Sequence, residues 1–177
     1  MGSQTREELV HTARVETAIG ELRLASTAAG LAFLELPHSN GQGFAGWLRR
    51  WAPGARVDQG FAPNRSAAKQ LAEYLAGKRR DFELELDLRG TEFQLAVWRA
   101  LCAIPYGETI SYGEQARRVG QPNAPRAVGA ANGANPIAIV VPCHRIIGSG
   151  GSLTGYGGGL DRKQWLLRHE GAPRSLF

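Results

Sequence analysis

The stretch that decides how the chain is interpreted is IAIVVPCHRIIG, at Ile137–Gly148. An unbroken apolar run of this length is too short to cross a bilayer and predicts a buried strand. Pro142 cannot donate a hydrogen bond to a neighbouring strand, so we expect the strand to end there and the chain to enter a turn. This places the Cys143 thiol at the end of a rigid element, beside His144 and Arg145. Neighbouring cations lower the pKa of a thiol, so Cys143 is a candidate nucleophile.

A lone cysteine after an apolar segment can equally be a core residue, because cysteine is among the residue types most often buried. The pair Cys143–His144 by itself therefore leaves both interpretations open. The motifs on either side of this pair favour the nucleophile.

Five motifs between Thr91 and Ala172 accompany the cysteine. In chain order they read FQLAVWRAL, IPYGETISYGEQA, RAVGAANGANP, IVVPCHRII and TGYGGGLDRKQWLLRHEG. Their order and spacing resemble those of the O6-alkylguanine-DNA alkyltransferases, also called methylated-DNA–protein-cysteine methyltransferases. The resemblance implies direct-reversal repair of double-stranded DNA. In this reaction the alkyl group of O6-alkylguanine, or of O4-alkylthymine, passes irreversibly and in a single turnover to Cys143.

Length and composition are those of an ordinary globular protein. The chain has 177 residues, 43% of them hydrophobic, which is enough for one large or two small cores. Residues 1–10, MGSQTREELV, lack the apolar centre of a signal peptide, so we expect a cytoplasmic chain with no membrane partner. Two cysteines make no disulfide framework, and with four scattered histidines they show no zinc-ligand spacing. We expect no metal, no cofactor and no obligate protein partner, and hence a monomer.

Positive charge is concentrated in the second half of the chain. Residues 1–90 hold 12 Lys and Arg against 11 Asp and Glu, and residues 91–177 hold 9 against 5. A basic excess favours a polyanionic partner, although many other proteins share it.

Residues 1–90 predict an α+β domain, with a small mixed or antiparallel sheet and helices, that serves as structural support. Apolar residues at 19–24 and 31–36 predict two strands around a turn at Ala29-Gly30. Residues 82–88 alternate between apolar and acidic side chains, which predicts a further strand with one solvated face rather than a metal site. Helical spacing predicts two helices, one carrying Phe44, Trp47, Leu48 and Trp51, the other capped by Asn64, carrying Ala68, Leu71 and Leu75, and ended by Gly77.

Residues 91–177, after a boundary at Arg89-Gly90, predict a mainly helical domain of winged helix-turn-helix type. Three residue pairs fit N-terminal helix caps: Thr91 with Gln94, Ser111 with Glu114, and Asp161 with Gln164. The first cap precedes a helix with one apolar face, which leaves Cys102 at its side as a structural residue. The second precedes a short helix at 111–119, a turn, and another helix that Asn123 and Pro125 begin. This is helix-turn-helix spacing.

The helix expected from Pro125 to about Gly133 has almost no bulk and carries one charge, on Arg126. A helix that reads bases in the major groove normally displays long polar side chains. Small residues instead suit close approach to a narrow groove, although they equally permit tight helix packing. The resemblance favours the minor groove, because the family uses this helix there. The residues expected to contact DNA are Ser111, Tyr112, Arg126, Ala127, Gly129 and Ala130.

The resemblance also implies roles for individual residues. Because the alkylated base must leave the duplex to be reached, Arg126 would fill the vacated stack and Tyr112 would press on the adjacent phosphate. His144 would take the thiol proton through water while Glu170 orients its imidazole. Asn135 would stiffen the turn beneath Cys143, and the Tyr112 hydroxyl would assist guanine departure. The main-chain carbonyls of Cys143 and Ile146 would read the exocyclic amine, and Tyr156, with Gly157, would close the pocket.

Two other classes of protein remain alternatives. A Cys-His-Glu hydrolase would need an acyl intermediate, and a catalytic histidine directly after its cysteine is not the papain-like arrangement. A damage-binding module of the alkyltransferase-like kind lacks the cysteine, whereas Cys143 is present here.

Overall fold

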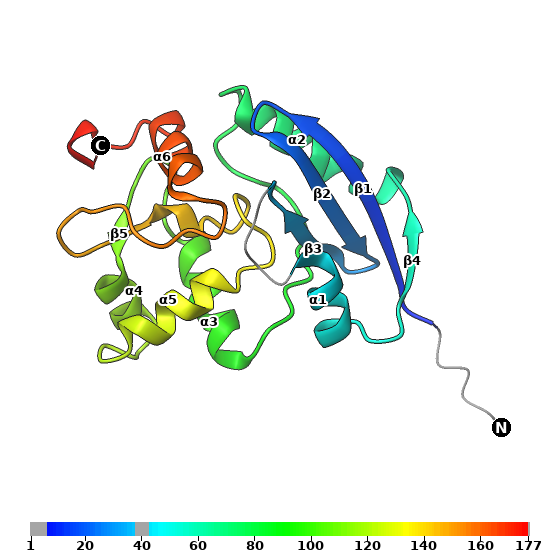
Figure 1. Cartoon of the computed structure of the whole chain (residues 1–177), viewed down its shortest axis with the longest axis horizontal. Coiled ribbons are helices and arrows are strands. Elements are labelled where there is room, and N and C mark those ends of the chain that lie inside the picture. The colour runs from blue at the N-terminus through cyan, green and yellow to red at the C-terminus, as the bar shows by residue number, and fades with distance from the viewer. Residues whose placement is uncertain (1–6, 38–42, 177) are drawn as a thin grey trace.

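The N-terminal domain is built on a four-stranded mixed sheet (Figure 1). The structure is a computed structural model that describes residues 7–37 and 43–176. The strands lie in the order β3-β2-β1-β4; β1 pairs antiparallel with β2 and parallel with β4, and β2 pairs antiparallel with β3. The strands at 19–24 and 31–36 are confirmed, whereas the sequence patterns missed β1 and β4. The strand bounds are β1 (Leu9–Thr17), β2 (Gly20–Thr27), β3 (Gly30–Glu35) and β4 (Arg56–Gln59).

Both helices expected in this domain are present, as α1 (Gly43–Trp51) and α2 (Arg65–Leu75), the latter after a 3₁₀ turn at Ala62–Asn64. Asn64 is the N-cap residue of α2, as predicted, but its side chain makes no capping bond. Asn64 is instead fully buried, accepts a 2.8 Å hydrogen bond from the Ser26 hydroxyl and donates to the His11 carbonyl. It therefore ties the start of α2 to the sheet.

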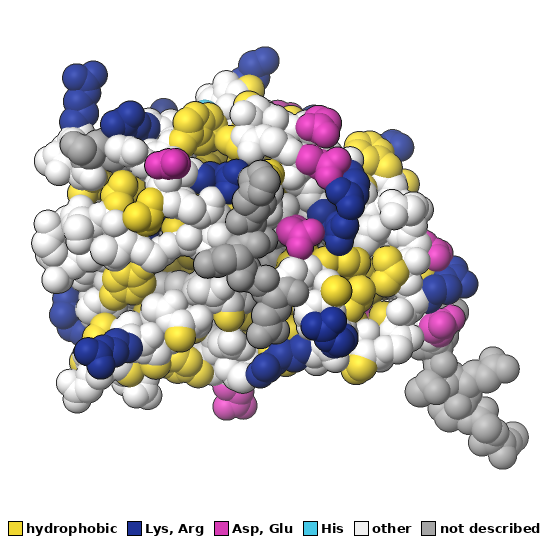
Figure 2. All heavy atoms as spheres, in the orientation of Figure 1, with side chains coloured by type: hydrophobic (Ala, Val, Ile, Leu, Met, Phe, Trp, Pro, Cys, Tyr) yellow, Lys and Arg dark blue, Asp and Glu magenta, His cyan; other side chains and the backbone are white. Residues whose placement is uncertain are grey.

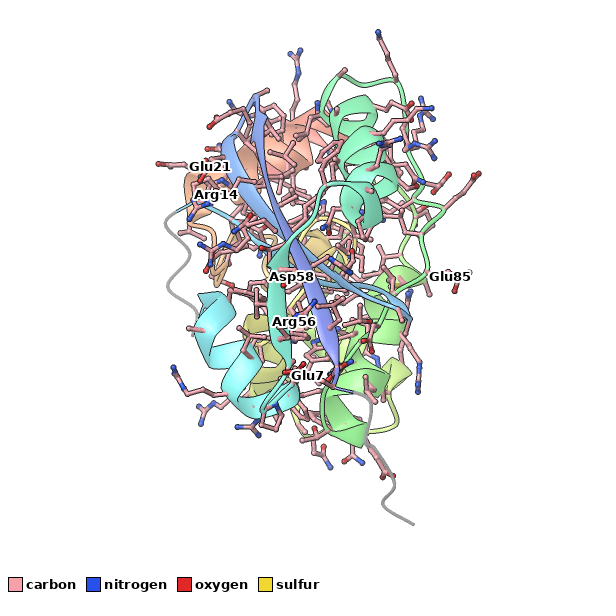
Figure 3. All side chains as sticks on the ribbon, turned by 90° about the vertical axis from the view of Figure 1, so that its right-hand side faces the viewer. Glu7, Arg14, Glu21, Arg56, Asp58 and Glu85 are labelled. Carbon is pink, nitrogen blue, oxygen red and sulfur yellow. The ribbon has the colours of Figure 1, made fainter. Side chains whose placement is uncertain are left out.

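The strand predicted at residues 82–88 is not formed. In this segment Glu83 and Glu85 are exposed, while Asp87 and the apolar side chains are half-buried. Within the described residues the segment makes one isolated parallel bridge, from Leu86 to Leu31. The alternation correctly gives the two faces of the segment, since Glu85 projects into solvent (Figure 3). The outer face of the sheet is likewise charged, with ion pairs Arg14–Glu21 and Arg56–Asp58.

The C-terminal domain is mainly helical and has the expected helix-turn-helix (Figure 1). Its helices are α3 (Glu92–Cys102), α4 (Tyr112–Arg118), α5 (Pro125–Gly133) and α6 (Leu160–His169), with a parallel pair of short strands β5 (Ile110–Ser111) and β6 (Ile146–Ile147), and 3₁₀ turns at Cys143–Arg145 and Arg174–Leu176. A reciprocal pair of buried amides, Gln115 of α4 and Asn132 of α5, holds the two helices together at 2.7 and 3.0 Å.

Two of the three predicted helix caps are confirmed. Thr91 and Gln94 form a full capping box, and the Ser111 hydroxyl accepts from the Glu114 amide at 3.1 Å. Asp161 is not a cap, because α6 already begins at Leu160 and its N-cap is Gly159, with a φ of 92°. Similarly, α5 begins at Pro125 as expected, but its N-cap is Ala124 rather than Asn123.

The apolar run 137–141 is a buried turn and not the predicted strand. Ile139 has a φ of 73°, a left-handed conformation that is strained for a β-branched residue. The Val141 amide donates to the Ile137 carbonyl at 2.9 Å, which reverses the chain. The turn is hydrogen-bonded to strand β3. The Leu34 amide donates to the Pro136 carbonyl, and Leu34 forms an isolated parallel β-bridge with Ile137. The turn that leads to Cys143 is therefore braced by the N-terminal sheet.

Candidate active site and DNA-binding helix

Cys143 begins the 3₁₀ turn that follows Pro142, as the sequence predicted for the end of the apolar run. Asn135 lies beneath it and makes three contacts. Its amide nitrogen donates to the Val141 carbonyl at 2.7 Å and to Cys143 Sγ at 3.2 Å, and its oxygen accepts from the Ile137 amide at 3.0 Å. One side chain thus holds both ends of the strained turn and the sulfur.

His144 and Glu170 form a completely buried pair, with His144 Nε2 lying 2.9 Å from Glu170 Oε1. Arg145 donates to both oxygens of the same carboxylate, at 2.9 Å each, and to the Ile104 carbonyl at 2.5 Å. Burial alone would raise the pKa of Glu170, but the hydrogen bonds from His144 and Arg145 outweigh it and hold that pKa far below its ordinary value. Burial lowers the pKa of His144, against the pull of Glu170, so the imidazole is neutral at pH 7.

The cationic setting predicted for the thiol is present, but His144 and Arg145 do not provide it. Both are turned towards Glu170, and the charge that acts on Cys143 belongs to Lys163 of α6. Burial raises the pKa of Cys143, while the hydrogen bond from Asn135 and the positive charge of Lys163 work in the opposite direction. Cys143 is therefore a half-buried residue whose thiol has two groups in place to stabilise its thiolate.

Sequence reasoning missed Lys163, which is fully buried. Its ammonium donates to the Thr154 carbonyl at 2.7 Å and lies 6.0 Å from the ring centroid of Tyr112. Burial lowers the pKa of Lys163 to about 8, against the attraction of a Cys143 thiolate. The available signal was the spacing of seven residues between Lys163 in α6 and Glu170 at its C-cap, which places the two on the same side of the helix.

The Tyr112 hydroxyl contacts the glycine-rich loop before α6. It donates to the carbonyls of Thr154 at 3.0 Å and Gly155 at 3.3 Å. Burial raises the pKa of Tyr112, so its hydroxyl remains a proton donor at neutral pH.

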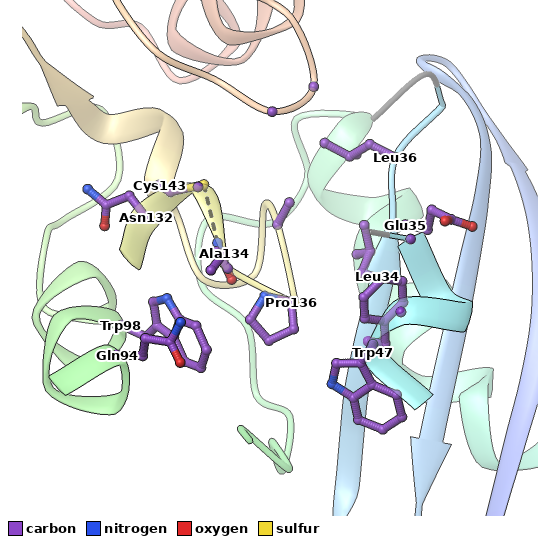
Figure 4. A pocket seen from close by; sticks show the side chains of 18 of the residues that line it. Leu34, Glu35, Leu36, Trp47, Gln94, Trp98, Asn132, Ala134, Pro136 and Cys143 are labelled. Carbon is purple, nitrogen blue, oxygen red and sulfur yellow. Dashed lines mark hydrogen bonds between the residues drawn. The ribbon is translucent and has the colours of Figure 1, made fainter. Parts of the chain in front are cut away.

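A cavity of about 450 Å³ lies in front of Cys143, between the two domains (Figure 4). Cys143, Asn135, Tyr156 and Gly157 line it on the C-terminal side, and β3 and α1 form the opposite wall. The Tyr156 hydroxyl is buried and has no hydrogen-bond partner among residues 7–37 and 43–176. Ile146 does not line this cavity; its side chain is in the core and its amide donates to the Cys143 carbonyl.

The residues expected to contact DNA lie on the helix-turn-helix. Arg126, Ala127 and Ala130 are exposed on α5, and Gly129 is half-buried where an added Cβ would lie 3.5 Å from the Tyr112 ring. The Ser111 hydroxyl is committed to capping α4. On the face seen in Figure 2, basic side chains are spread over both domains, so they do not by themselves mark a DNA-binding surface.

The described part of the chain has neither a cluster of metal ligands nor a membrane-spanning helix. There, no three His, Cys, Asp or Glu side chains gather in a way that could hold a metal ion. None of its helices combines the length and the apolar character needed to cross a membrane.

Comparison with known proteins matches both domains to one family. Residues 10–88 match the ribonuclease-like domain of 6-O-methylguanine DNA methyltransferase, and residues 92–172 match its DNA binding domain. A methylated-DNA–protein-cysteine methyltransferase of Mycolicibacterium paratuberculosis is 59% identical over 68% of this chain and 82% of its own length. The protein of that name from Mycobacterium bovis is 48% identical over 92% and 93%.

Solved structures agree with these relatives. The Mycobacterium tuberculosis protein OGT, crystallised in complex with DNA, superposes with a TM-score of 0.78 at 46% identity, covering 95% of this chain and 97% of that one. With matches over both domains and at these identities, the chain belongs to the 6-O-methylguanine DNA methyltransferase family.

Proposed function

We propose that this protein repairs O6-alkylguanine, and O4-alkylthymine, in double-stranded DNA by moving the alkyl group onto Cys143. The observation that carries the proposal is the position of Cys143, whose sulfur accepts a hydrogen bond from Asn135 at the wall of a cavity large enough for a base. Family membership supports the same reaction.

The transfer requires one bond to form and one to break. The Cys143 thiolate attacks the alkyl carbon, the carbon–oxygen bond breaks, and its electron pair leaves with O6 of guanine. The thiol proton passes through water to His144 Nδ1, which is buried and has no partner within the described residues, while Nε2 faces Glu170. Guanine takes up one proton as it leaves, with the Tyr112 hydroxyl assisting, and this proton balances the one that the thiol gave up. The transfer therefore needs no cofactor. The main-chain carbonyl of Cys143 reads the exocyclic amine of the base, and Tyr156 and Gly157 close the cavity over it. The role expected for the Ile146 carbonyl is not kept, because Ile146 does not line the cavity.

The product is a thioether on Cys143. Water does not hydrolyse a thioether under ordinary conditions, so the thiol is not restored. Each molecule therefore acts once.

DNA binding by α5 in the minor groove completes the proposal. The exposed small residues Ala127 and Ala130, with Gly129, allow the helix backbone to approach the duplex closely, and Ser111 and Tyr112 lie at the start of the adjoining helix. Arg126 is exposed and, in the described part of the chain, no acidic side chain pairs with it, so it can enter the stack that the extruded base vacates.

The two domains have different functions in this proposal. We assign structural support to residues 1–90, and binding and transfer to residues 91–177. We further propose a cytoplasmic monomer, because a reducing compartment preserves the free thiol that the reaction consumes.

The replacement Cys143→Ser tests the assignment of the nucleophile. A serine hydroxyl is far less ionised than a thiol at neutral pH, so methyl transfer from a duplex containing O6-methylguanine should be lost while affinity for that duplex is kept. Transfer can be followed with a labelled methyl group and binding by gel shift. Transfer that survives in this variant removes Cys143 from the mechanism.

A further inference from the structure

Tyr74 belongs to helix α2 of the N-terminal domain, yet its hydroxyl contacts the buried pair formed by His144 and Glu170 in the C-terminal domain. It donates a 2.6 Å hydrogen bond to Glu170 Oε1, the same oxygen that lies 2.9 Å from His144 Nε2. Tyr74 is fully buried, so water does not compete for this contact.

The Glu170 carboxylate is surrounded by hydrogen-bond donors. Oε1 is contacted by Tyr74, by His144 and, at 2.9 Å, by Arg145. Oε2 accepts from Arg145 at 2.9 Å and from the Gly107 amide at 3.3 Å. Among these donors, the N-terminal domain contributes Tyr74, and it does so at the oxygen that orients His144.

We propose that Tyr74 is a positioning residue for alkyl transfer, through which the N-terminal domain sets the basicity of His144. The inference rests on the proposed function, in which His144 takes the proton of Cys143. A hydroxyl that donates to Oε1 draws negative charge from it and weakens its attraction for a protonated imidazole. Without the hydroxyl, the carboxylate stabilises the imidazolium more strongly, and His144 stays protonated to a higher pH.

Other charged and titratable groups surround the pair. Arg145 lies in the 3₁₀ turn with His144, Lys163 comes from α6, and Tyr106 from the segment before β5. Cys143 and Tyr156 face the same buried region. Burial and the charge of Glu170 both raise the pKa of Tyr74, so its hydroxyl stays protonated, and remains a donor, throughout the range in which His144 titrates.

Tyr74 also has a packing role, which the test must separate from the proposed one. Its ring lies 5.3 Å from the rings of Phe82 and His169 and 6.1 Å from that of Tyr106, and its carbonyl contacts His169 Nε2 at 2.6 Å. The replacement Tyr74→Phe keeps the ring and the carbonyl and removes the hydroxyl. Tyr106→Phe is the matched control, because it also removes one hydroxyl from this aromatic cluster. The Tyr106 hydroxyl donates to the His169 carbonyl at 3.2 Å and not to Glu170.

The experiment measures the rate of methyl transfer from a duplex containing O6-methylguanine in the full-length wild type and both variants, from about pH 5 to about pH 9. For Tyr74→Phe we expect the midpoint of the rate profile to move up by roughly 0.5–1 pH unit, making transfer below the midpoint roughly three- to tenfold slower. Tyr106→Phe should follow the wild type, and duplex affinity should be equal in all three. A Tyr74→Phe profile that overlays the wild type, or an equal shift in Tyr106→Phe, overturns the inference.

A double-mutant cycle shows whether the effect passes through the carboxylate. In a Glu170→Gln background, Tyr74→Phe should no longer move the midpoint, because the carboxylate charge that the hydroxyl modulates is gone. A shift of the same size in that background overturns the inference.

A second measurement uses the wild type and therefore does not require any variant to fold. By NMR, the Tyr74 hydroxyl proton should exchange slowly and show a cross-peak to the His144 ring proton, whereas free exchange with solvent contradicts the contact. If the wild type transfers no methyl group to Cys143, it is the proposed function that fails, so the two failures are distinguishable.

Discussion

Replacing Glu170 by glutamine would remove one negative charge beside a buried positive one. Arg145 is 7% exposed, and its guanidinium donates to both oxygens of Glu170. Glutamine keeps the size of the side chain but has one oxygen and one amide nitrogen, so it cannot accept both of these hydrogen bonds. The guanidinium would be left buried without its counter-ion.

The expected loss of stability is large. Breaking a buried ion pair by removing one partner costs roughly 3–5 kcal/mol, because the remaining charge stays desolvated. A domain of ordinary stability unfolds with a free energy of about 5–15 kcal/mol. We therefore expect Glu170→Gln to fold but to lose about 3–5 kcal/mol of its free energy of unfolding at pH 7.

The pH dependence of this loss has a definite sign. The pKa of Glu170 is lower in the folded protein than the value of about 4.3 expected in the unfolded chain. Its contribution to stability is therefore complete above about pH 4.3 and is lost as the pH falls towards the folded pKa. The difference in the free energy of unfolding between the wild type and the variant should be largest at neutral pH and should become smaller below about pH 4.

Urea denaturation followed by circular dichroism measures this difference, with Glu108→Gln as the control. Glu108 is exposed and close in sequence to the Gly107 contact, so its replacement should change the free energy of unfolding by about 0.5 kcal/mol or less. The denaturant slopes of the three proteins should agree. A loss in Glu170→Gln no larger than that in the control would refute the assignment of Glu170 as the counter-ion of Arg145.

The remaining predictions concern DNA and the thiol. For Arg126→Ala we expect transfer to duplex DNA to fall roughly ten- to a hundredfold, while transfer to free O6-benzylguanine barely changes because no stack needs filling; equal losses on the two substrates would end the intercalating role. Lys163→Met should raise the pKa of Cys143 by removing the positive charge that acts on it, measured from the pH dependence of iodoacetamide alkylation mapped to that residue. An unchanged midpoint would contradict the role given to Lys163.

The sequence predicts the elements whose signals are local. The strands β2 and β3, the capping box at Thr91 and the helix-turn-helix each depend on residues within a few positions of one another. Cys143, His144 and Asn135 are also close in the chain, and the resemblance added Glu170, which the structure brings to 2.9 Å from His144.

The rest depends on contacts that no local pattern encodes. An apolar run without a period cannot distinguish a strand from a buried turn, and at 137–141 the turn is imposed by Asn135 and by the edge of β3. The alternation at 82–88 gives the two faces of an extended segment but not whether a partner strand lies beside it. Tyr74 and Lys163 become recognisable when the fold brings them to Glu170 and Cys143.

Intact mass spectrometry with peptide mapping shows whether Cys143 itself accepts the alkyl group. After incubation with excess duplex containing O6-methylguanine, we expect a mass gain of one methyl group per chain, located on Cys143, with no further methyl transferred when fresh duplex is added. A methyl group found on Cys102 or on another residue, or repeated turnover by an unmodified chain, would contradict this assignment.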